Sequence, residues 1–356
     1  QSVIFVLGVG AGNVIQGNRI YNTSLPAGDV SGNASTALRV SSSSDVVVRG
    51  NTVSNYQFHG SVDFSSDNPA YIITSGEGGL TGSGIAVNGG VGAIIERVTV
   101  ENNIVFGAAN TGLGVGFANN SIIRGNTVNS SGQYGIGLYG DANNHSVVTG
   151  NVIEANTSCS NGWLNGGMSG ISVTHIGTGN IIRRNVCFGN RQGLAGHKGY
   201  DWYGDGMGII VDLNSDGTKV MSNLCFGNEG CGIGIVKSED CVVLNNTIVG
   251  NGLCPHFGDF PGVTLAPDFT QGWTVRNCYF ANNILYNNRT RQLEAWDLTG
   301  HTLIHNLYLA GPLTDPAVGD NLFYWPDPAL PIAQHMMNFA EWQSYWAGKG
   351  SGNSDG

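Results

Sequence analysis

A short apolar segment that ends in asparagine recurs along most of the chain. The segment reads VVVRGN up to Asn51, SIIRGN up to Asn126 and CVVLNN up to Asn246. Ten asparagines taken as equivalent lie 33, 52, 23, 25, 34, 38, 23, 37 and 23 residues apart: Asn18, Asn51, Asn103, Asn126, Asn151, Asn185, Asn223, Asn246, Asn283 and Asn306. Self-similarity on this scale is typical of a solenoid, in which each repeat contacts only its neighbours.

The spacing predicts one coil of about 23 residues for each asparagine. Steps that exceed 23 by ten to fifteen residues indicate a coil with an inserted loop, and the step of 52 fits two coils or one coil with a long excursion. The sequence lacks amphipathic segments with the 3.6-residue period of a helix. Only 11% of the residues are charged and 56 are glycines, which leaves little material for solvated helix faces. We therefore expect an all-β protein.

A second motif, Gly-Ile-x-Val, follows the asparagine segment in most coils. It reads GIAV at 84–87, GLGV at 112–115, GIGL at 135–138, GISV at 170–173, GIIV at 208–211, GIGI at 232–235 and GVTL at 262–265. The second and fourth residues are branched and apolar, whereas the third is small or variable. Because side chains alternate along a strand, this pattern predicts strands with one buried face that stack in register.

These two motifs resemble the repeats of the right-handed parallel β-helix superfamily, the pectate-lyase-like group with its asparagine ladders. The resemblance covers roughly residues 12 to 310. It implies a right-handed parallel β-helix solenoid with an Asn ladder along one corner. That scaffold carries lyases, hydrolases, epimerases, tailspikes and adhesins, so the resemblance implies no single function.

The end of the sequence predicts a cap for the solenoid. The segment NFAEWQSYWAGKG (338–350) is typical of a short helix, and Asn338 is a suitable N-cap residue. An exposed solenoid end needs such a cap. We expect a β-helix domain over residues 1–337 and a C-terminal cap and tail over 338–356.

Charge and hydropathy exclude several kinds of partner. The net charge is −10, the pI is near 5.1 and no run of Lys or Arg occurs, so neither a nucleic acid nor an anionic membrane would find a basic surface. No apolar stretch reaches 18 residues, which excludes a transmembrane helix. The chain opens at Gln1 without a signal peptide, as a processed chain does, and we expect a secreted, extracellular protein. N-glycosylation sequons support secretion: Asn22, Asn33, Asn119, Asn129, Asn144, Asn156, Asn245 and Asn288.

Stacking would bring residues that are distant in the sequence onto one flank. The fifth and sixth positions of the Gly-Ile-x-Val segments form a column with a spacing of about 5 Å between coils. The column runs through Tyr139, His175, Asp212 and Lys237, and continues near Asp268 towards Glu294 and Trp296. Few other columns collect titratable groups, so we expect a carbohydrate-handling groove on this flank.

The insert at 190–207 should overhang the same flank, because it comes directly before the strand at 208–211. Loops on a rigid scaffold often carry function, and aromatic side chains offer flat faces to sugar rings. The predicted substrate-binding residues are Tyr139, Arg191, His197, Lys198, Tyr200, Trp202, Glu294 and Trp296.

Among the possible functions, the sequence favours a polysaccharide lyase that acts on a uronate-containing glycan. Lys237 would be the base that removes the proton beside the uronate carboxylate. His175 would serve as acid or base, and Asp205 and Asp212 complete the predicted catalytic set. Asp201, Asp205 and Asp212 are candidate oxygen ligands for Ca²⁺, the candidate cofactor, which would neutralise the substrate carboxylate.

Two other functions stay open. A glycoside hydrolase would need two carboxyl groups about 5 to 9 Å apart, and Asp205, Asp212, Asp268 and Glu294 could supply them. The net charge of −10 favours this version on a neutral polysaccharide, because it repels a polyuronate. A non-catalytic adhesin would bind glycans on flat sheets, but it predicts uniform coils, whereas the inserts are uneven and centred on 157–261.

The seven cysteines include no CxxC motif, which argues against a zinc ribbon or a thioredoxin-type site. Cys187 and Cys225 occupy the same place in NVCFGN and NLCFGN. We expect them to stack inside the coil, as two buried thiols or as a disulfide.

Overall fold

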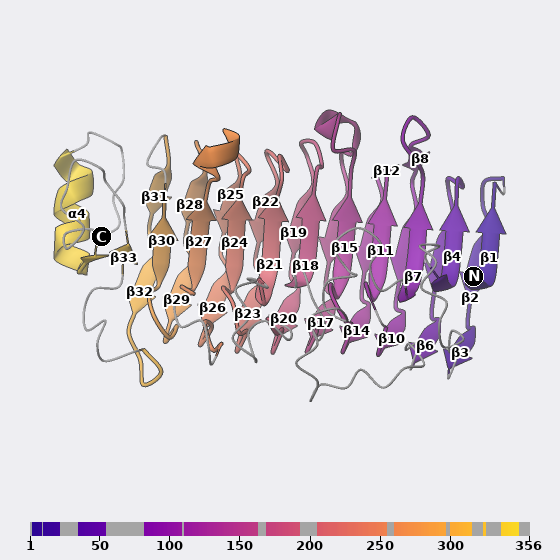
Figure 1. Ribbon diagram of the computed structural model, residues 1–356, viewed down its shortest axis with the longest axis horizontal. Helices are drawn as coiled ribbons and strands as arrows, with labels where there is room; N and C mark the ends of the chain where they lie inside the picture. Colours follow the sequence, from indigo (N-terminus) through magenta and orange to yellow (C-terminus); the bar gives the residue numbers. More distant parts are fainter. Residues whose placement is uncertain are drawn as a thin grey trace.

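The computed structural model describes residues 2–8, 10–21, 35–54, 82–108, 110–162, 169–192, 205–254, 260–296, 300–314, 323–324 and 336–348. Here the chain winds into stacked coils, and nearly every coil contributes one strand to each of three long sheets (Figure 1). The stack is elongated, with β1 at one end and α4 at the other (Figure 1). The predicted all-β solenoid is confirmed.

Sheet A is named here for the strands whose labels run across the middle of Figure 1. Its order is β1 (Ser2–Leu7), β4 (Ser35–Ser41), β7 (Gly82–Asn88), β11 (Leu113–Gly116), β15 (Ile136–Tyr139), β18 (Ser169–Thr174), β21 (Met207–Asp212), β24 (Ile233–Val236), β27 (Val263–Ala266), β30 (Leu293–Ala295), β33 (Phe323–Tyr324) and β34 (Met336–Met337). All its neighbouring strands are parallel except the last pair, β33 and β34.

Sheets B and C contain short parallel strands. Sheet B has the order β2 (Val14–Gln16), β5 (Val47–Arg49), β9 (Thr99–Glu101), β13 (Ile122–Arg124), β16 (Val152–Glu154), β19 (Ile181–Arg183), β22 (Lys219–Met221), β25 (Val242–Leu244), β28 (Tyr279–Ala281) and β31 (Thr302–Ile304). Sheet C has the order β3 (Arg19–Tyr21), β6 (Thr52–Ser54), β10 (Ile104–Phe106), β14 (Thr127–Asn129), β17 (Thr157–Cys159), β20 (Val186–Phe188), β23 (Leu224–Phe226), β26 (Thr247–Val249), β29 (Ile284–Tyr286) and β32 (Leu307–Leu309). The turns between sheets A and B hold β8 (Ile95–Glu96) paired with β12 (Ala118–Asn119), and the single-turn helices η1 (His145–Val147) and η2 (Phe269–Gln271).

The Gly-Ile-x-Val strands stack in register inside sheet A, as predicted. Ile136 pairs with Ile171 and Ile171 with Ile209, while two residues further along Val173 pairs with Val211. These aliphatic side chains are buried in one continuous core. Because burial of each such side chain contributes about 1.5–3 kcal/mol, the stacked aliphatic columns stabilise every coil against its neighbours.

The long step between Asn51 and Asn103 is one coil with an excursion. Strand β5 pairs directly with β9, and β6 pairs directly with β10, so no additional coil lies between them.

The predicted asparagine ladder stands at the corner between sheets B and C. From Asn18 to Asn306, the side-chain Nδ2 of each member donates to the Oδ1 of the next at 2.9–3.0 Å. One predicted member is wrong, because the ladder passes through Asn156 and not Asn151. Asn151 lies at the other end of the three-residue strand β16, where its Nδ2 donates to Asn180 Oδ1 at 2.9 Å. Both corners that flank β16 carry asparagine, and spacing alone does not distinguish them.

A second asparagine ladder, which sequence reasoning missed, follows the strands of sheet C. Its members are Asn161, Asn190, Asn228, Asn251 and Asn288, joined by amide hydrogen bonds of 2.8–3.0 Å. These amides are fully buried. Hydrogen-bonded asparagine side chains therefore link successive coils at two of the corners around the core.

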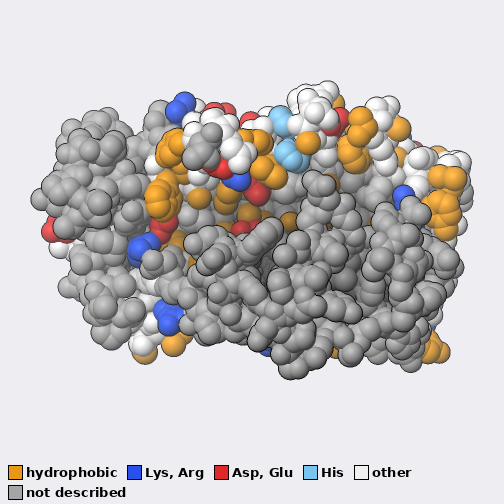
Figure 2. Space-filling view, viewed as in Figure 1, with side chains coloured by type: hydrophobic (Ala, Val, Ile, Leu, Met, Phe, Trp, Pro, Cys, Tyr) orange, Lys and Arg blue, Asp and Glu red, His pale blue; other side chains and the backbone are white. Residues whose placement is uncertain are grey.

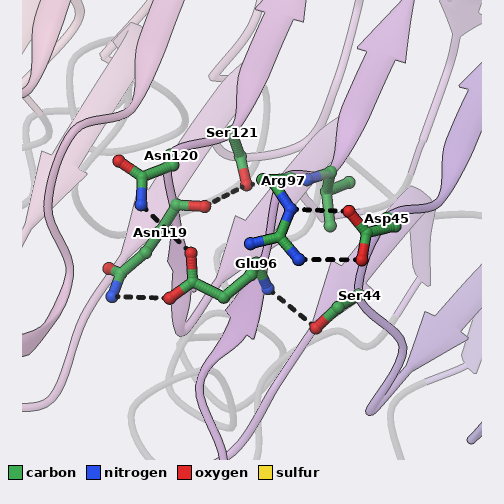
Figure 3. A network of polar contacts seen from close by, with 8 residues as sticks. Ser44, Asp45, Glu96, Arg97, Asn119, Asn120 and Ser121 are labelled. Carbon is green, nitrogen blue, oxygen red and sulfur yellow. Dashed lines mark hydrogen bonds and ion pairs between the residues drawn. The ribbon is translucent and has the colours of Figure 1, made fainter. Parts of the chain in front are cut away.

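Charged side chains bridge neighbouring coils on the outside of the solenoid. Between sheets A and B, the Arg97 guanidinium pairs with both carboxylate oxygens of Asp45 in the preceding coil, at 2.6 and 2.9 Å (Figure 3). The adjacent Glu96 carboxylate accepts from Asn119 and Asn120 of the next coil, at 3.4 and 3.1 Å (Figure 3). A chain with few charges thus uses some of them as links from coil to coil.

Cys187 and Cys225 stack inside the solenoid, as expected. They are register partners in β20 and β23, and both are completely buried. They are present as thiols, and burial raises the pKa of Cys187 well above its ordinary value. Of the two predicted alternatives, the structure contains the buried thiols.

The predicted terminal helix is α4 (Phe339–Gly348). Asn338 Oδ1 accepts from the backbone N–H of Glu341, and Glu341 Oε2 accepts from the backbone N–H of Asn338, both at 3.0 Å. This reciprocal pair is a capping box, so the N-cap prediction is confirmed. Trp342 of α4 is buried and stacks on Phe323 of β33, with ring centroids 4.7 Å apart. The helix closes the end of sheet A, while the division of the chain at residue 337 stays a prediction.

No helix within the described ranges has the length and apolar character that crossing a membrane requires.

The ladder makes a prediction about stability. The side chain of Asn223 takes part in four hydrogen bonds of 3.0 Å, two accepted from Asn185 and two donated to Ile182 O and Asn246 Oδ1. Asn223→Ala leaves buried partners unsatisfied, so we expect the free energy of unfolding to fall by about 3 kcal/mol, measured by urea denaturation. The exposed Asn143→Ala is the control and should change it by less than about 0.5 kcal/mol. Equal effects of the two substitutions would mean that a ladder amide contributes no more to the free energy of unfolding than an exposed asparagine does.

Candidate functional site

The predicted column lies on the outer face of sheet A, at the ends of its middle strands. Tyr139 of β15 pairs with Thr174 of β18, which pairs with Asp212 of β21. Lys237 follows directly after β24, and its backbone N–H donates to Ala266 O at 3.0 Å. Figure 2 shows acidic, basic, histidine and hydrophobic side chains gathered over these middle strands. The register brings together residues that lie almost one hundred positions apart in the sequence.

Two carboxyl groups flank β21. Asp205 stands two residues before the strand, and Asp212 is its last residue; both keep part of their surface exposed. Desolvation by the surrounding protein raises the pKa of Asp205 to about 7, and the negative charge of Asp212 adds to this effect. Desolvation also raises the pKa of Asp212 to about 6, although Lys237 and a hydrogen bond of 2.8 Å from the Leu213 N–H oppose the rise. Near neutral pH such a pair offers one proton donor and one proton acceptor.

Lys237 supplies positive charge to this pair. It acts electrostatically on both carboxyls and lowers the pKa that burial alone would give each of them. Its Nζ lies 3.8 Å from Asp268 Oδ2, and both side chains are about one quarter exposed, at 25% and 23%. The backbone of Lys237 is left-handed, with φ of 51°, which is uncommon for lysine and marks the turn that leaves sheet A.

Two tyrosines complete the group that we call the carboxyl cluster, which consists of Tyr134, Tyr139, Asp205, Asp212 and Lys237. The two tyrosine rings meet edge to face, with centroids 6.3 Å apart. Burial raises the pKa of Tyr139 to about 12, and its hydroxyl lies 3.3 Å from Thr111 Oγ1. Burial also raises the pKa of Tyr134, and the charges of Tyr139, Asp205 and Asp212 add to the rise. Both phenols are therefore protonated donors at neutral pH.

Tyr134 was missed by sequence reasoning. It lies directly before the Gly of the Gly-Ile-x-Val segment, whereas the predicted column followed only the residues after that segment. The sequence could have indicated it, because the residues that precede the Gly-Ile-x-Val segments also stack from coil to coil and form a second column. Asp205 lies at that upstream end as well. In the structure, Asp205 from the upstream end and Asp212 from the downstream end both raise the pKa of Tyr134.

His175 lies on the rim beside the cluster. It follows β18 with a left-handed backbone, and its N–H donates to Leu213 O at 3.0 Å. Its ring stacks on His145 of η1 with centroids 5.5 Å apart, while His145 Nε2 lies 2.8 Å from Asn214 Nδ2. Burial lowers the pKa of His175, and His145 lowers it further. The catalytic role predicted for His175 stays a prediction, and the structure pairs this residue with His145.

Glu294 lies in β30 of sheet A, two coils beyond β24, and Trp296 directly follows that strand. Glu294 is a register partner of Thr264 in β27 and is mostly buried. Its carboxylate pairs with Arg291 and accepts from Trp296 Nε1. Trp296 is 41% exposed and could present a flat face to a ligand. Arg191 follows Asn190 of the second ladder, and its N–H donates to Asn161 O at 2.7 Å.

Five predicted site residues lie outside the described residues: His197, Lys198, Tyr200, Asp201 and Trp202. Within the ranges that the structure describes, no three His, Cys, Asp or Glu side chains gather in a way that could hold a metal ion. The proposed Ca²⁺ site included Asp201 together with Asp205 and Asp212, so it stays a prediction.

Two family models match the sequence. One, described as right handed beta helix region, matches residues 164–307. The other, described as periplasmic copper-binding protein (NosD), matches residues 4–203, which is more than half of the chain. This chain belongs to the NosD family. The predicted right-handed parallel β-helix is thereby confirmed, and a comparison of the NosD-family chain with curated proteins finds no match.

The NosD-family chain also resembles solved structures at low sequence identity. A mutant of the periplasmic alginate epimerase AlgG is 14% identical with a TM-score of 0.56, over 88% of this chain and 69% of that one. The Dettilon tailspike protein is 15% identical with a TM-score of 0.59, over 91% of this chain and 57% of that one. DFA-IIIase from Arthrobacter chlorophenolicus A6, without its lid, is 15% identical with a TM-score of 0.52, over 87% and 68%. Similarity at this level shows the shared fold alone.

The family description names copper, which proteins bind through imidazole and sulfur ligands. His145 and His175 form a pair without a third ligand, and His145 already contacts Asn214. Cys278 is buried, and its N–H donates to His301 Nδ1 at 3.1 Å, which occupies that nitrogen. The described residues of this chain therefore do not fit a copper site.

The raised pKa of Asp205 predicts how stability depends on pH. In the unfolded chain an aspartate has a pKa near 3.9, so the folded chain retains a proton that the unfolded chain loses, and stability is lost as pH rises from about 4 through about 7. Asp205→Asn removes the partly desolvated charge. We expect it to raise the free energy of unfolding by roughly 1–2 kcal/mol at pH 8 and by little at pH 4, measured by denaturation at both pH values. A gain of equal size at both would show that ionisation of Asp205 is not its cause.

Proposed function

We propose that this chain is an exported enzyme that hydrolyses a glycan by general acid–base catalysis at the carboxyl cluster. The single observation that carries the proposal is the pair of partly exposed carboxyls whose pKa values are raised to about 7 and about 6 on one sheet face. Carboxyls with no task are seldom held in such an environment, because each raised pKa costs stability at neutral pH.

The two pKa values suggest a division of roles. Asp205, with the higher pKa, would donate its proton to the glycosidic oxygen as the bond to the sugar breaks. Asp212, with the lower pKa, would act as the carboxylate, either taking a proton from an attacking water or attacking the sugar carbon itself. Lys237 would keep Asp212 ionised, since its positive charge lowers that pKa. The protonated hydroxyls of Tyr139 and Tyr134 would donate hydrogen bonds to the sugar.

The comparisons support a glycan substrate and export. Of the structures that share this fold, one is named as an alginate epimerase and another as a tailspike protein. The family description and the AlgG name both contain the word periplasmic, which supports an exported chain. We propose no role for copper, because the described residues do not fit it.

A lyase that acts on a uronate glycan is the second candidate. Lys237 beside Asp212 favours it, since an ammonium could neutralise a uronate carboxylate, and so does the likeness to an alginate epimerase. Elimination needs a base of suitable pKa next to the sugar proton. Lys237 was the base predicted from the sequence, but an ammonium that neutralises the uronate carboxylate cannot also remove the proton. The raised pKa of Tyr139 makes this neighbouring phenol a poor substitute, whereas the carboxyls have pKa values close to neutrality. This contrast favours hydrolysis. Binding alone, as in an adhesin, gives no reason for tuned carboxyls.

The pH dependence of turnover tests the pair. Activity should need Asp212 ionised and Asp205 protonated, so we expect a bell-shaped profile with a maximum between about pH 6 and pH 7. Reducing sugar released from a panel of polysaccharides measures it. Asp205→Asn should remove the limb on the alkaline side, because an amide does not ionise. A profile that stays flat from pH 5 to pH 8 would contradict the proposed pair.

Substitution of the pair tests the residues. Asp205→Asn and Asp212→Asn should each lower kcat by a factor of about 10² to 10⁴. The matched control is Glu154→Gln on sheet B, which makes the same carboxyl-to-amide change where Glu154 pairs with Arg183 at 2.7 Å. It should leave kcat unchanged. An unsaturated product that absorbs in the near ultraviolet, formed from alginate or pectate and lost in Lys237→Ala, would replace hydrolysis by elimination.

A further inference from the structure

A polar cavity of about 360 Å³ opens on the rim of sheet A. The residues that line it include Asn214, Asp216, Glu239, Gln271 and Trp273, and most of its lining surface is polar. These residues come from three successive coils, in the turns that follow β21, β24 and β27. The hairpin around η2, which supplies the indole, stands on the upper edge of the molecule in Figure 1.

The cavity adjoins the carboxyl cluster through the chain itself. Asn214 lies two residues after Asp212, and Glu239 lies two residues after Lys237. The hairpin that carries the indole begins at Asp268, whose carboxylate lies 3.8 Å from Lys237 Nζ. The cavity is therefore tied to the proposed cleavage site by covalent neighbours and by an ion pair.

The wall that carries Trp273 is ordered by backbone pairing. The Asp268 N–H donates to Trp273 O at 3.0 Å, and the Trp273 N–H donates to Asp268 O at 2.9 Å. The indole itself is partly exposed. A planar apolar side chain held in place at little entropic cost is a suitable platform for a sugar ring.

The other walls are acidic and accept hydrogen bonds. Asp216 Oδ1 accepts from the Glu239 N–H at 2.7 Å, and Glu239 Oε1 accepts from Thr274 Oγ1. Burial raises the pKa of Asp216, and the charges of Glu239 and Asp240 add to the rise, while its bond to the Glu239 N–H and the nearby His145 oppose it. None of the described residues that line the cavity is Lys or Arg. Carboxylate and amide groups bind sugar hydroxyls well, but two carboxylates without a cation repel a uronate.

We infer that this cavity is a subsite for an uncharged sugar ring of the glycan chain, stacked on Trp273 and hydrogen-bonded to Asp216, Glu239 and Asn214. The inference rests on the proposed function, since it assigns the cavity to the substrate that the carboxyl cluster cleaves. It deepens that function by naming neutral glycans as the substrate class and by excluding polyuronates from this cavity.

Substitution of Trp273 tests the subsite. Trp273→Ala should raise KM for a cleaved neutral polysaccharide, such as a glucan, mannan or xylan, about tenfold and change kcat little, because the platform binds without taking part in bond breaking. The matched control is Phe269→Ala, which removes a 60% exposed aromatic side chain from the same hairpin but outside the cavity wall. Phe269→Ala should leave KM unchanged. Equal KM values for the two variants would overturn the inference.

Binding measured without turnover separates this inference from the proposed function. Affinity electrophoresis of the full chain in gels that contain the neutral polymers, alginate or polygalacturonate should show retardation by a neutral polymer and none by either uronate. Trp273→Ala should abolish the retardation, while Asp205→Asn should keep it. If Asp205→Asn retains turnover but Trp273→Ala loses binding, the proposed catalysis fails and the subsite stands. Stronger retardation of the wild-type chain by a uronate than by any neutral polymer would refute the subsite.

Discussion

Hydrogen bonding between equivalent positions of successive coils is the constraint on which the rest of this molecule depends. The parallel pairing of three sheets fixes each residue over its counterpart one coil away, and the two buried asparagine ladders keep the corners in step. A buried amide that misses its partner is costly, so a coil that slips by one residue would lose the ladder bonds and turn its apolar side chains outwards. Register is therefore strongly specified, and register places every functional side chain.

The carboxyl cluster is a part of sheet A where the regular stacking holds side chains in an environment that costs stability. On most of the described coils the outward positions of sheet A are filled by small or uncharged residues such as Gly114, Gly137, Ser172 and Thr264. At β21 the chain instead puts carboxyls at both ends of the strand, in surroundings that raise the pKa of each. Partial exposure leaves these groups accessible, while the nearby protein removes enough water to hold a proton near neutrality. Lys237 moderates the cost because its charge favours the ionised forms.

The same fold serves proteins whose names point to different activities, among them an epimerase and a tailspike, at identities of 14% and 15%. The core columns and ladders satisfy the backbone in the same way whatever the outer face carries, so the fold does not select the chemistry. In this chain the outer face combines tuned carboxyls with an acidic rim cavity that has an indole wall. The negative charge of that cavity, more than the fold, would determine whether a neutral or an acidic sugar can bind there.

The sequence alone was sufficient for the solenoid, because its repeats are strictly local patterns of apolar side chains, Gly and Asn. It predicted the in-register Gly-Ile-x-Val strands, the N-cap at Asn338 and the placement of Tyr139 and Asp212 in one column, each of which the structure contains. It misassigned Asn151 for Asn156, since a three-residue strand with asparagine at both ends satisfies either corner. It missed Tyr134, whose pKa is raised by the charges of Asp205 and Asp212 from other coils. Only the tertiary structure decided the pKa values of the carboxyls, the pairing of His175 with His145 and the cavity beside Trp273. Each of these arises from desolvation and through-space contact between coils, and such effects have no counterpart in the spacing of residues along the chain.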